Sequence, residues 1–246
     1  MTGKHNRIRV EADAEHLAQA AADLVVETAQ AAIAHSGRFT LALAGGSTPR
    51  RLYERLAAEP YVSKIIWPHV HLFWGDERCV PPDHPDSNYR MARESLLEHI
   101  LIPGENIHRI QGELAPPEAA ALYEQHLRTF FGNEPRFDLI LLGMGADGHT
   151  ASLFPHTPAL QERERWVVPN YALSQQSWRI TLTIPVINAA AHIIFLVAGA
   201  KKAETLHRVL TGPYLPDELP AQQVQPAQGD VLWLIDKAAA RRLNRP

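Results

Sequence analysis

Short apolar runs alternate with helical stretches along most of this chain, and this alternation constrains the fold more strongly than any other feature. Each apolar run ends in Gly, Asp or Pro, and most lack the polar alternation of a half-exposed strand, as is typical of a parallel sheet buried on both faces. The apolar runs are FTLALAGG, VHLFWGDE, FDLILLGMG, RITLTIP, HIIFLVAGA and VLWLID. The helical stretches are PRRLYERLAAE, SNYRMARESLLEHI, PPEAAALYEQHLRTFFG, KKAETLHRVL and DKAAARRL. This order predicts an α/β fold with a doubly wound, mostly parallel sheet.

The remaining segments favour a single domain. Residues 14–36 are rich in alanine with apolar residues at helical spacing, and Gly37 follows as a C-terminal helix cap. Residues 213–230 are rich in Pro and Gln, which predicts a long, stiff surface loop. Because no repeat, low-complexity block or linker interrupts the 246 residues, we expect one domain over residues 1–246.

The composition argues against several classes of protein. A net charge of −3 and a pI near 6.5 provide no basic field for nucleic acid or a membrane surface. Cys79 is the single cysteine, so no intrachain disulfide can form. The first residues, MTGKHNRIRVEADAE, lack an apolar core of signal-peptide length, and no apolar segment reaches the roughly 18 residues of a membrane span. We therefore expect a cytoplasmic protein, monomeric or weakly homo-oligomeric, with no nucleic-acid or membrane partner.

The motif GMGADGH at residues 143–149 follows an apolar run and has the glycine spacing of a dinucleotide-binding turn. Such a turn requires a substantial helix after the third glycine, but Pro155 and Pro158 would end or bend that helix within about two turns. Nucleotide binding is therefore disfavoured, and we expect no cofactor. The glycines instead predict a tight turn that leaves Asp147 and His149 facing a cleft.

The first strong strand–turn–helix unit, LALAGGSTPRRLYERLA, predicts a small anion site. Gly45 and Gly46 allow close backbone approach, Ser47 and Thr48 offer hydroxyl groups, and the helix N-terminus adds free N–H donors with a positive partial charge. Phosphate or carboxylate would suit these donors. A helix cap with nothing bound is the alternative.

A second strand ends in the charged triplet Asp76, Glu77 and Arg78, and Ser87 and Asn88 then cap the next helix. Such a triplet is usually a solvated face or a local salt bridge. At the carboxyl edge of a parallel strand, however, it could supply an arginine fork for a phosphate or a sugar acid.

Three further basic residues follow or begin strands. Lys201 and Lys202 start a helix after an Ala-Gly pair, where a lysine opposes the helix dipole unless an anion compensates. Arg179 opens the RITLTIP run and is a candidate of the same kind. By contrast, His69 and His71 lack a third ligand at metal spacing, so we expect no metal site.

Taken together, these stretches resemble the 6-phosphogluconolactonases, in the superfamily that they share with glucosamine-6-phosphate deaminases. The resemblance runs from about residue 37 to residue 210. It rests on LALAGGSTPRRLY, WGDERCVPPDHPDSNYRMA, LLGMGADGHTASLFP, RITLTIPVINAA and AGAKKAE. It implies a three-layer α/β/α fold and hydrolysis of 6-phosphoglucono-1,5-lactone, without metal or nucleotide, in the oxidative pentose phosphate pathway.

The resemblance also implies roles for individual residues. His149 matches the family's base, which activates water, and Asp147 shapes its loop. The base assignment agrees with the chemistry of imidazole, whose ordinary pKa of about 6.5 suits proton transfer near neutral pH. The candidate substrate- and phosphate-binding residues are Gly45, Gly46, Ser47, Thr48, Asp76, Glu77, Arg78, Asn88, Arg179 and Lys202.

Two alternatives compete with this interpretation. The related deaminases carry DGHIAFNEP, with a glutamate beside the histidine, and MDEY; this chain has Phe154 in place of that glutamate and GDER in place of MDEY. Both differences favour the lactonases. The second alternative is a non-catalytic sugar-phosphate sensor, but sensors with this fold carry a helix-turn-helix segment, for which this chain has neither room nor a basic helix.

Overall fold

A parallel sheet forms the centre of the molecule. In the computed structural model, which describes residues 7–243, seven strands pair in the order β1-β10-β9-β6-β2-β3-β5, and every pairing is parallel. The strands are β1 (Arg7–Glu11), β2 (Phe39–Leu43), β3 (Val70–Trp74), β5 (Ile107–His108), β6 (Leu139–Leu142), β9 (His192–Val197) and β10 (Asp230–Asp236).

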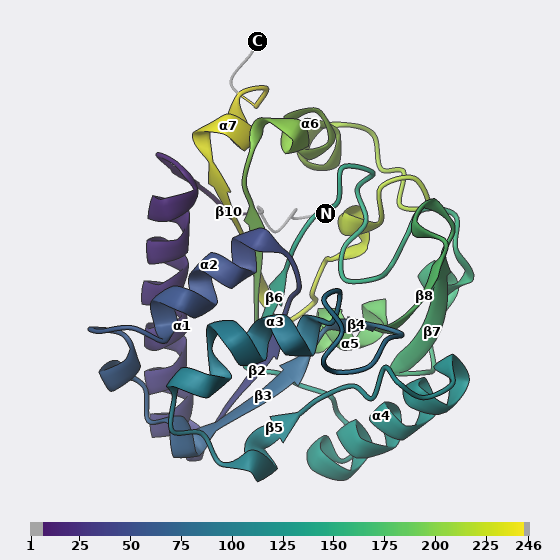
Figure 1. Cartoon of the computed structure of the whole chain (residues 1–246). Helices are drawn as coiled ribbons and strands as arrows, with labels where there is room; N and C mark the ends of the chain where they lie inside the picture. Colours follow the sequence, from purple (N-terminus) through teal and green to yellow (C-terminus); the bar gives the residue numbers. More distant parts are fainter. Residues whose placement is uncertain (1–6, 244–246) are drawn as a thin grey trace.

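Helices cover both faces of this sheet, which confirms the predicted three-layer α/β/α fold. Figure 1 shows α1 and α2 on one side of the strands and α4 on the other. The helices are α1 (Ala14–Ser36), α2 (Ser47–Leu56), α3 (Asn88–Ser95), α4 (Pro116–Phe131), α5 (Ile184–Ala189), α6 (Ala203–Thr211) and α7 (Lys237–Ala240). As predicted, α1 ends at Gly37, which adopts a left-handed conformation with φ of 77°. None of the helices among residues 7–243 has the length and apolar character needed to cross a membrane.

A small antiparallel sheet lies beside the main one. It pairs β4 (Asp76–Arg78), β8 (Ser177–Leu182) and β7 (Val167–Ala172) in that order. The RITLTIP run, grouped above with the strands of the parallel sheet, belongs here instead. Apolar runs of this length look alike in both kinds of sheet, because the sequence does not show which strand will pair with which.

The segment of residues 213–230 is only in part the surface loop that its composition predicts, because residues 219–224 are buried whereas residues 213–218 are largely exposed. A short 3₁₀ helix, Pro220–Gln223, is buried within it, and so are Leu219 and Val224. The side-chain amide of Gln222 donates to the carbonyl of Pro213 and accepts from the N–H of Leu215. These bonds satisfy backbone groups that would otherwise need water, and this allows a proline-rich segment to be buried.

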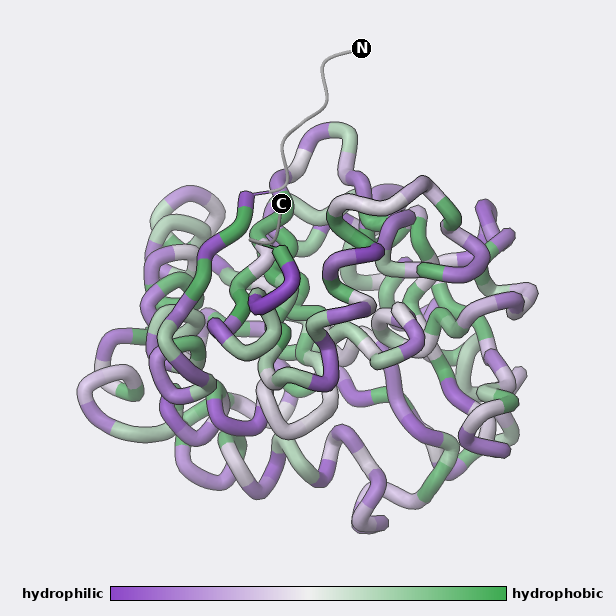
Figure 2. The backbone as a smooth tube through the Cα atoms, turned by 90° about the horizontal axis from the view of Figure 1, so that it is seen from above, coloured by the Kyte–Doolittle hydropathy of each residue, from purple (hydrophilic) through white to green (hydrophobic). Residues whose placement is uncertain are grey.

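The apolar core fixes the carboxyl ends of the central strands. Figure 2 shows hydrophobic residues gathered in the interior and hydrophilic residues toward the outside. Within the core, the hydroxyl of Tyr53 accepts from the N–H of Ala44 and donates to its carbonyl, and Tyr123 makes the same pair of bonds with Trp74. Burial raises the pKa of both phenols, so each remains a neutral donor. These bonds hold the carboxyl ends of β2 and β3 in place.

Candidate active site

A cavity of about 250 Å³ lies at the carboxyl ends of β2, β3, β6 and β9. Ligands in open α/β sheets bind at this edge because the connecting loops diverge there. Many of the sequence-predicted residues line the cavity together, although they lie far apart in the chain. They are Gly45, Gly46, Ser47, Thr48, Asp76, Arg78, Asn88, His149 and Lys202.

The GGST loop presents the N-terminus of α2 to the cavity. Gly46 is the N-cap, with φ of 106°, which favours glycine. A Cβ atom on Gly45 would lie 2.0 Å from Asn88 Oδ1, so this position has room only for glycine. The first N–H groups of α2 have no partner within the helix and carry a positive partial charge. This loop can therefore hold an anion through its backbone, and anion binding here stays a prediction.

The DGH turn, residues 145–149, holds a histidine and a carboxylate in contact. Asp147 Oδ1 lies 2.5 Å from His149 Nδ1. A Cβ atom on Gly145 would lie 2.1 Å from that nitrogen, and Gly148 has φ of 83°, so both glycines are needed for the turn. Because Nδ1 is engaged by Asp147, Nε2 is the ring nitrogen left without a hydrogen-bond partner among the described residues. His149 lines the cavity, and its ring packs 4.4 Å from that of Phe154.

Electrostatics favour a charged Asp147. Burial raises its pKa, but the hydrogen bond and the charge interaction with His149 outweigh burial, so the pKa of Asp147 lies below its ordinary value. As a carboxylate, Asp147 can only accept, and it therefore holds the proton on His149 Nδ1 and keeps Nε2 free to accept another. Lys202 also lines the cavity. Burial lowers the pKa of Lys202, and the Asp147 charge partly opposes this.

Asp76 brings a buried carboxylate to the cavity wall. Asp76 is 8% exposed, and Ser152 Oγ donates to Asp76 Oδ2 at 2.6 Å. Ser152 is held in turn by Asn170, whose amide donates to the Ser152 carbonyl at 2.9 Å. Neither Ser152 nor Asn170 was singled out from the sequence. A serine three positions after His149 carries no distinctive signal in the sequence, because its partner Asp76 lies 76 positions away in the chain.

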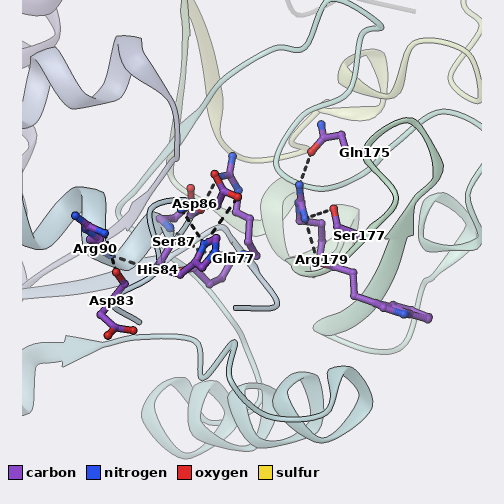
Figure 3. A network of polar contacts seen from close by, with 12 residues as sticks. Glu77, Asp83, His84, Asp86, Ser87, Arg90, Gln175, Ser177 and Arg179 are labelled. Atoms are coloured by element: carbon purple, nitrogen blue, oxygen red, sulfur yellow. Dashed lines mark hydrogen bonds and ion pairs between the residues drawn. The ribbon is translucent and has the colours of Figure 1, made fainter. Parts of the chain in front are cut away.

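Glu77 does not line the cavity, contrary to the prediction that it binds substrate. It is 2% exposed, and its carboxylate accepts from the N–H groups of Arg78, Asn88 and Tyr89 and from the Ser87 hydroxyl. Figure 3 shows Glu77 pointing toward Ser87. Burial raises the pKa of Glu77, although the backbone donors oppose it. Its physical role is to cap the N-terminus of α3. Side chains alternate along a strand, so Glu77 points away from the face of β4 that Asp76 and Arg78 share.

Arg179 lies beside the cavity but does not line it. It is paired with Arg78 across the small sheet, and its guanidinium donates to Ser177 Oγ at 2.6 Å and to Gln175 Oε1 (Figure 3). Arg78 does line the cavity, while its Nη1 donates to the carbonyl of Asp86 at 2.6 Å. The structure therefore brings Arg78 to the site and leaves Arg179 in a neighbouring network.

The structure offers few alternative chemical groups. Among residues 7–243, no set of three or more His, Cys, Asp or Glu side chains is arranged to hold a metal ion. The expectation of a metal-free reaction stays a prediction. Cys79 is half-buried, and burial raises its pKa to about 11, which makes it a poor nucleophile.

Comparison with known proteins places this chain in one family. Residues 12–233 match the family of glucosamine-6-phosphate isomerases and 6-phosphogluconolactonases, and the chain belongs to this family. Its relatives include the 6-phosphogluconolactonase of Nostoc sp., 49% identical over 90% of this chain and 92% of the relative. The 6-phosphogluconolactonase of Synechocystis sp. is 48% identical over 87% of this chain and 88% of its own length.

Solved structures agree with this assignment. The 6-phosphogluconolactonase of Trypanosoma brucei superposes with a TM-score of 0.86 at 31% identity, covering 97% of this chain and 98% of the other. A monomeric glucosamine-6-phosphate deaminase, 24% identical with a TM-score of 0.82 over 96% and 99% of the two chains, shares the fold. Within the family, this chain therefore groups with the 6-phosphogluconolactonases.

Proposed function

We propose that this protein hydrolyses 6-phosphoglucono-1,5-lactone to 6-phosphogluconate with His149 as the base. The observation that supports this most strongly is the Asp147–His149 contact of 2.5 Å, which leaves Nε2 free on a side chain that lines the cavity. The names of the relatives supply the substrate class. His149 and the GGST loop line the same cavity, and a base together with an anion-binding loop would suit a lactone that carries a phosphate.

The reaction proceeds in two proton transfers. His149 Nε2 accepts a proton from water while the water oxygen forms a bond to the lactone carbonyl carbon, giving a tetrahedral intermediate with a negatively charged oxygen. The bond from that carbon to the ring oxygen then breaks. The ring oxygen leaves as the C5 hydroxyl group and takes the proton from His149, and the new carboxylic acid releases its own proton to solvent. Asp147 stabilises the imidazolium between these steps.

The phosphate group is held at the other part of the cavity. The N-terminus of α2, with Ser47 and Thr48, donates hydrogen bonds to its oxygens, and Lys202 and Arg78 add positive charge. A lactone is already an activated acyl group, so water, a base and hydrogen-bond donors suffice, and neither a metal nor a covalent nucleophile is required.

One assay tests this proposal. Freshly prepared 6-phosphogluconolactone should lose its ester group far faster with the purified protein than spontaneously, with and without EDTA. Activity that disappears with EDTA and returns with zinc would contradict the metal-free mechanism. Release of ammonia from glucosamine 6-phosphate, with no acceleration of lactone hydrolysis, would assign the chain to the deaminase activity instead.

A further inference from the structure

Helix α6 carries a buried hydroxyl group that contacts the DGH turn. Thr205 is 8% exposed, and its Oγ1 donates to the carbonyl of Ala146 at 2.6 Å. Threonines within helices usually bond to the carbonyl four residues earlier, and Thr211 of the same helix does so with His207 at 2.8 Å. Thr205 instead reaches another element, and Ala146 directly precedes Asp147.

The same end of α6 also carries Lys202, three residues before Thr205. The ammonium of Lys202 interacts with the charge of Asp147, whose carboxylate contacts His149. Ala146 and Asp147 thus connect Lys202, which is proposed to bind phosphate, with His149, which is proposed as the base. The connection consists of one hydrogen bond and one charge interaction.

Other contacts hold the DGH turn from different directions. The Ala221 N–H donates to the carbonyl of Gly148 at 3.0 Å, and Thr150 Oγ1 donates to the carbonyl of Gly143 at 2.9 Å. Neither contact involves α6 or the GGST loop, the elements proposed to bind the phosphate. Among the described residues, Thr205 provides the hydrogen bond that joins α6 to this turn.

We propose that Thr205 is a positioning residue that couples phosphate binding at Lys202 to the orientation of Asp147 and His149. The inference rests on the function proposed above. A phosphate held by Lys202 and the N-terminus of α2 fixes the first turn of α6, and the Thr205–Ala146 hydrogen bond transmits that position to the DGH turn. Binding energy from a part of the substrate that does not react is thereby used to orient the reacting groups.

Three variants test this coupling through kcat and KM for 6-phosphogluconolactone. Thr205→Val keeps the shape of the side chain without its hydroxyl, and we expect kcat to fall about tenfold with KM changed less than about twofold. Thr205→Ser keeps the hydroxyl and should retain nearly the wild-type kcat. Thr211→Val, on the same helix but away from the site, is the matched control and should leave both constants unchanged.

A second measurement separates coupling from general loosening of the site. Phosphite added in solution should accelerate wild-type hydrolysis of the unphosphorylated glucono-1,5-lactone, because it occupies the phosphate site. This acceleration should be about tenfold smaller in Thr205→Val. The inference is overturned if Thr205→Val keeps the wild-type kcat, if Thr205→Ser is equally impaired, or if phosphite activates wild type and Thr205→Val alike. A wild-type protein that hydrolyses neither lactone overturns the proposed function, and this inference with it.

Discussion

Two strand ends of this protein carry acidic residues to the same edge of the sheet, and they use them differently. After β6, the Asp147 side chain is 41% exposed and meets a single histidine. After β3, Asp76 and Glu77 are buried, and protein donors bind both carboxylates. A carboxylate whose oxygens are occupied by protein donors stabilises structure, whereas one with a single titratable partner can control the proton of that partner.

This comparison predicts that substitutions at the DGH turn change the rate and that substitutions at Glu77 change stability. The largest effect should come from His149→Asn, which keeps the polarity of the side chain but removes the base. We expect kcat to fall about 10²–10⁴-fold with KM little changed. The variant should unfold at the wild-type urea concentration. A folded His149→Asn protein that retains more than about a tenth of the wild-type kcat would exclude His149 as the base.

Loss of Lys202 should act mainly on substrate binding. On the function proposed above, Lys202→Ala removes one charge-assisted bond to phosphate, which costs about 1.5–3 kcal/mol of binding free energy. The contact between Lys202 and the phosphate is present in both the ground and the transition state, so KM should rise. The coupling through Thr205 proposed above adds a fall in kcat, which should be smaller than the rise in KM. Lys201→Ala is the control, since Lys201 is exposed and does not line the cavity. A damaging Lys201→Ala beside a silent Lys202→Ala would reverse the two assignments.

Asp147→Asn should lower kcat about 10–100-fold, because a neutral amide stabilises the imidazolium of His149 less than a carboxylate does. Stability should change little, since Asp147 is partly exposed. Steady-state kinetics and urea unfolding on one preparation would measure both quantities. An Asp147→Asn variant with the wild-type kcat would show that the contact with His149 has no part in the reaction.

The matched substitution at the other strand end, Glu77→Gln, should show the opposite result. The substitution replaces one carboxylate oxygen with an amide NH₂ group, which cannot accept a hydrogen bond from the N–H groups of Asn88 and Tyr89. A buried donor at the start of α3 is then left unsatisfied, at a cost of about 1–3 kcal/mol in the free energy of unfolding. Activity per folded molecule should remain within about twofold of wild type at 25 °C. If kcat falls while stability is unchanged, Glu77 acts in the site and the distinction between the two strand ends fails.

Ser152→Ala should have the smallest effect. It tests whether Asp76 contacts substrate or is a structural carboxylate like Glu77. The substitution removes the 2.6 Å bond from Ser152 Oγ to Asp76 Oδ2. If Asp76 contacts substrate, the loss of this bond should raise KM or lower kcat about 2–10-fold, in line with one hydrogen bond. A loss of stability with unchanged kinetics would place Asp76 with Glu77 as a structural carboxylate.

Several features of this protein follow from the sequence by itself. The alternation of apolar runs and helical stretches predicts the α/β class, because burial on both faces leaves a local mark on each strand. Gly46 and Gly148 mark turns that need positive φ, and the DGH and GGST residues can be located because they directly follow such strands. These are local properties, and a chain carries them before it folds.

Other features were decided only by the tertiary structure. Asp76 and Glu77 are adjacent in sequence, yet one lines the cavity and the other caps α3, because neighbouring residues of a strand point to opposite faces and the pairing of β4 with β8 selects the face. Arg179 is held by Gln175 and Ser177 outside the cavity. Residues 219–224 are buried, and Leu219 among them packs against Gly148, 71 positions earlier. Contacts between distant residues set these outcomes, and composition and periodicity do not encode them.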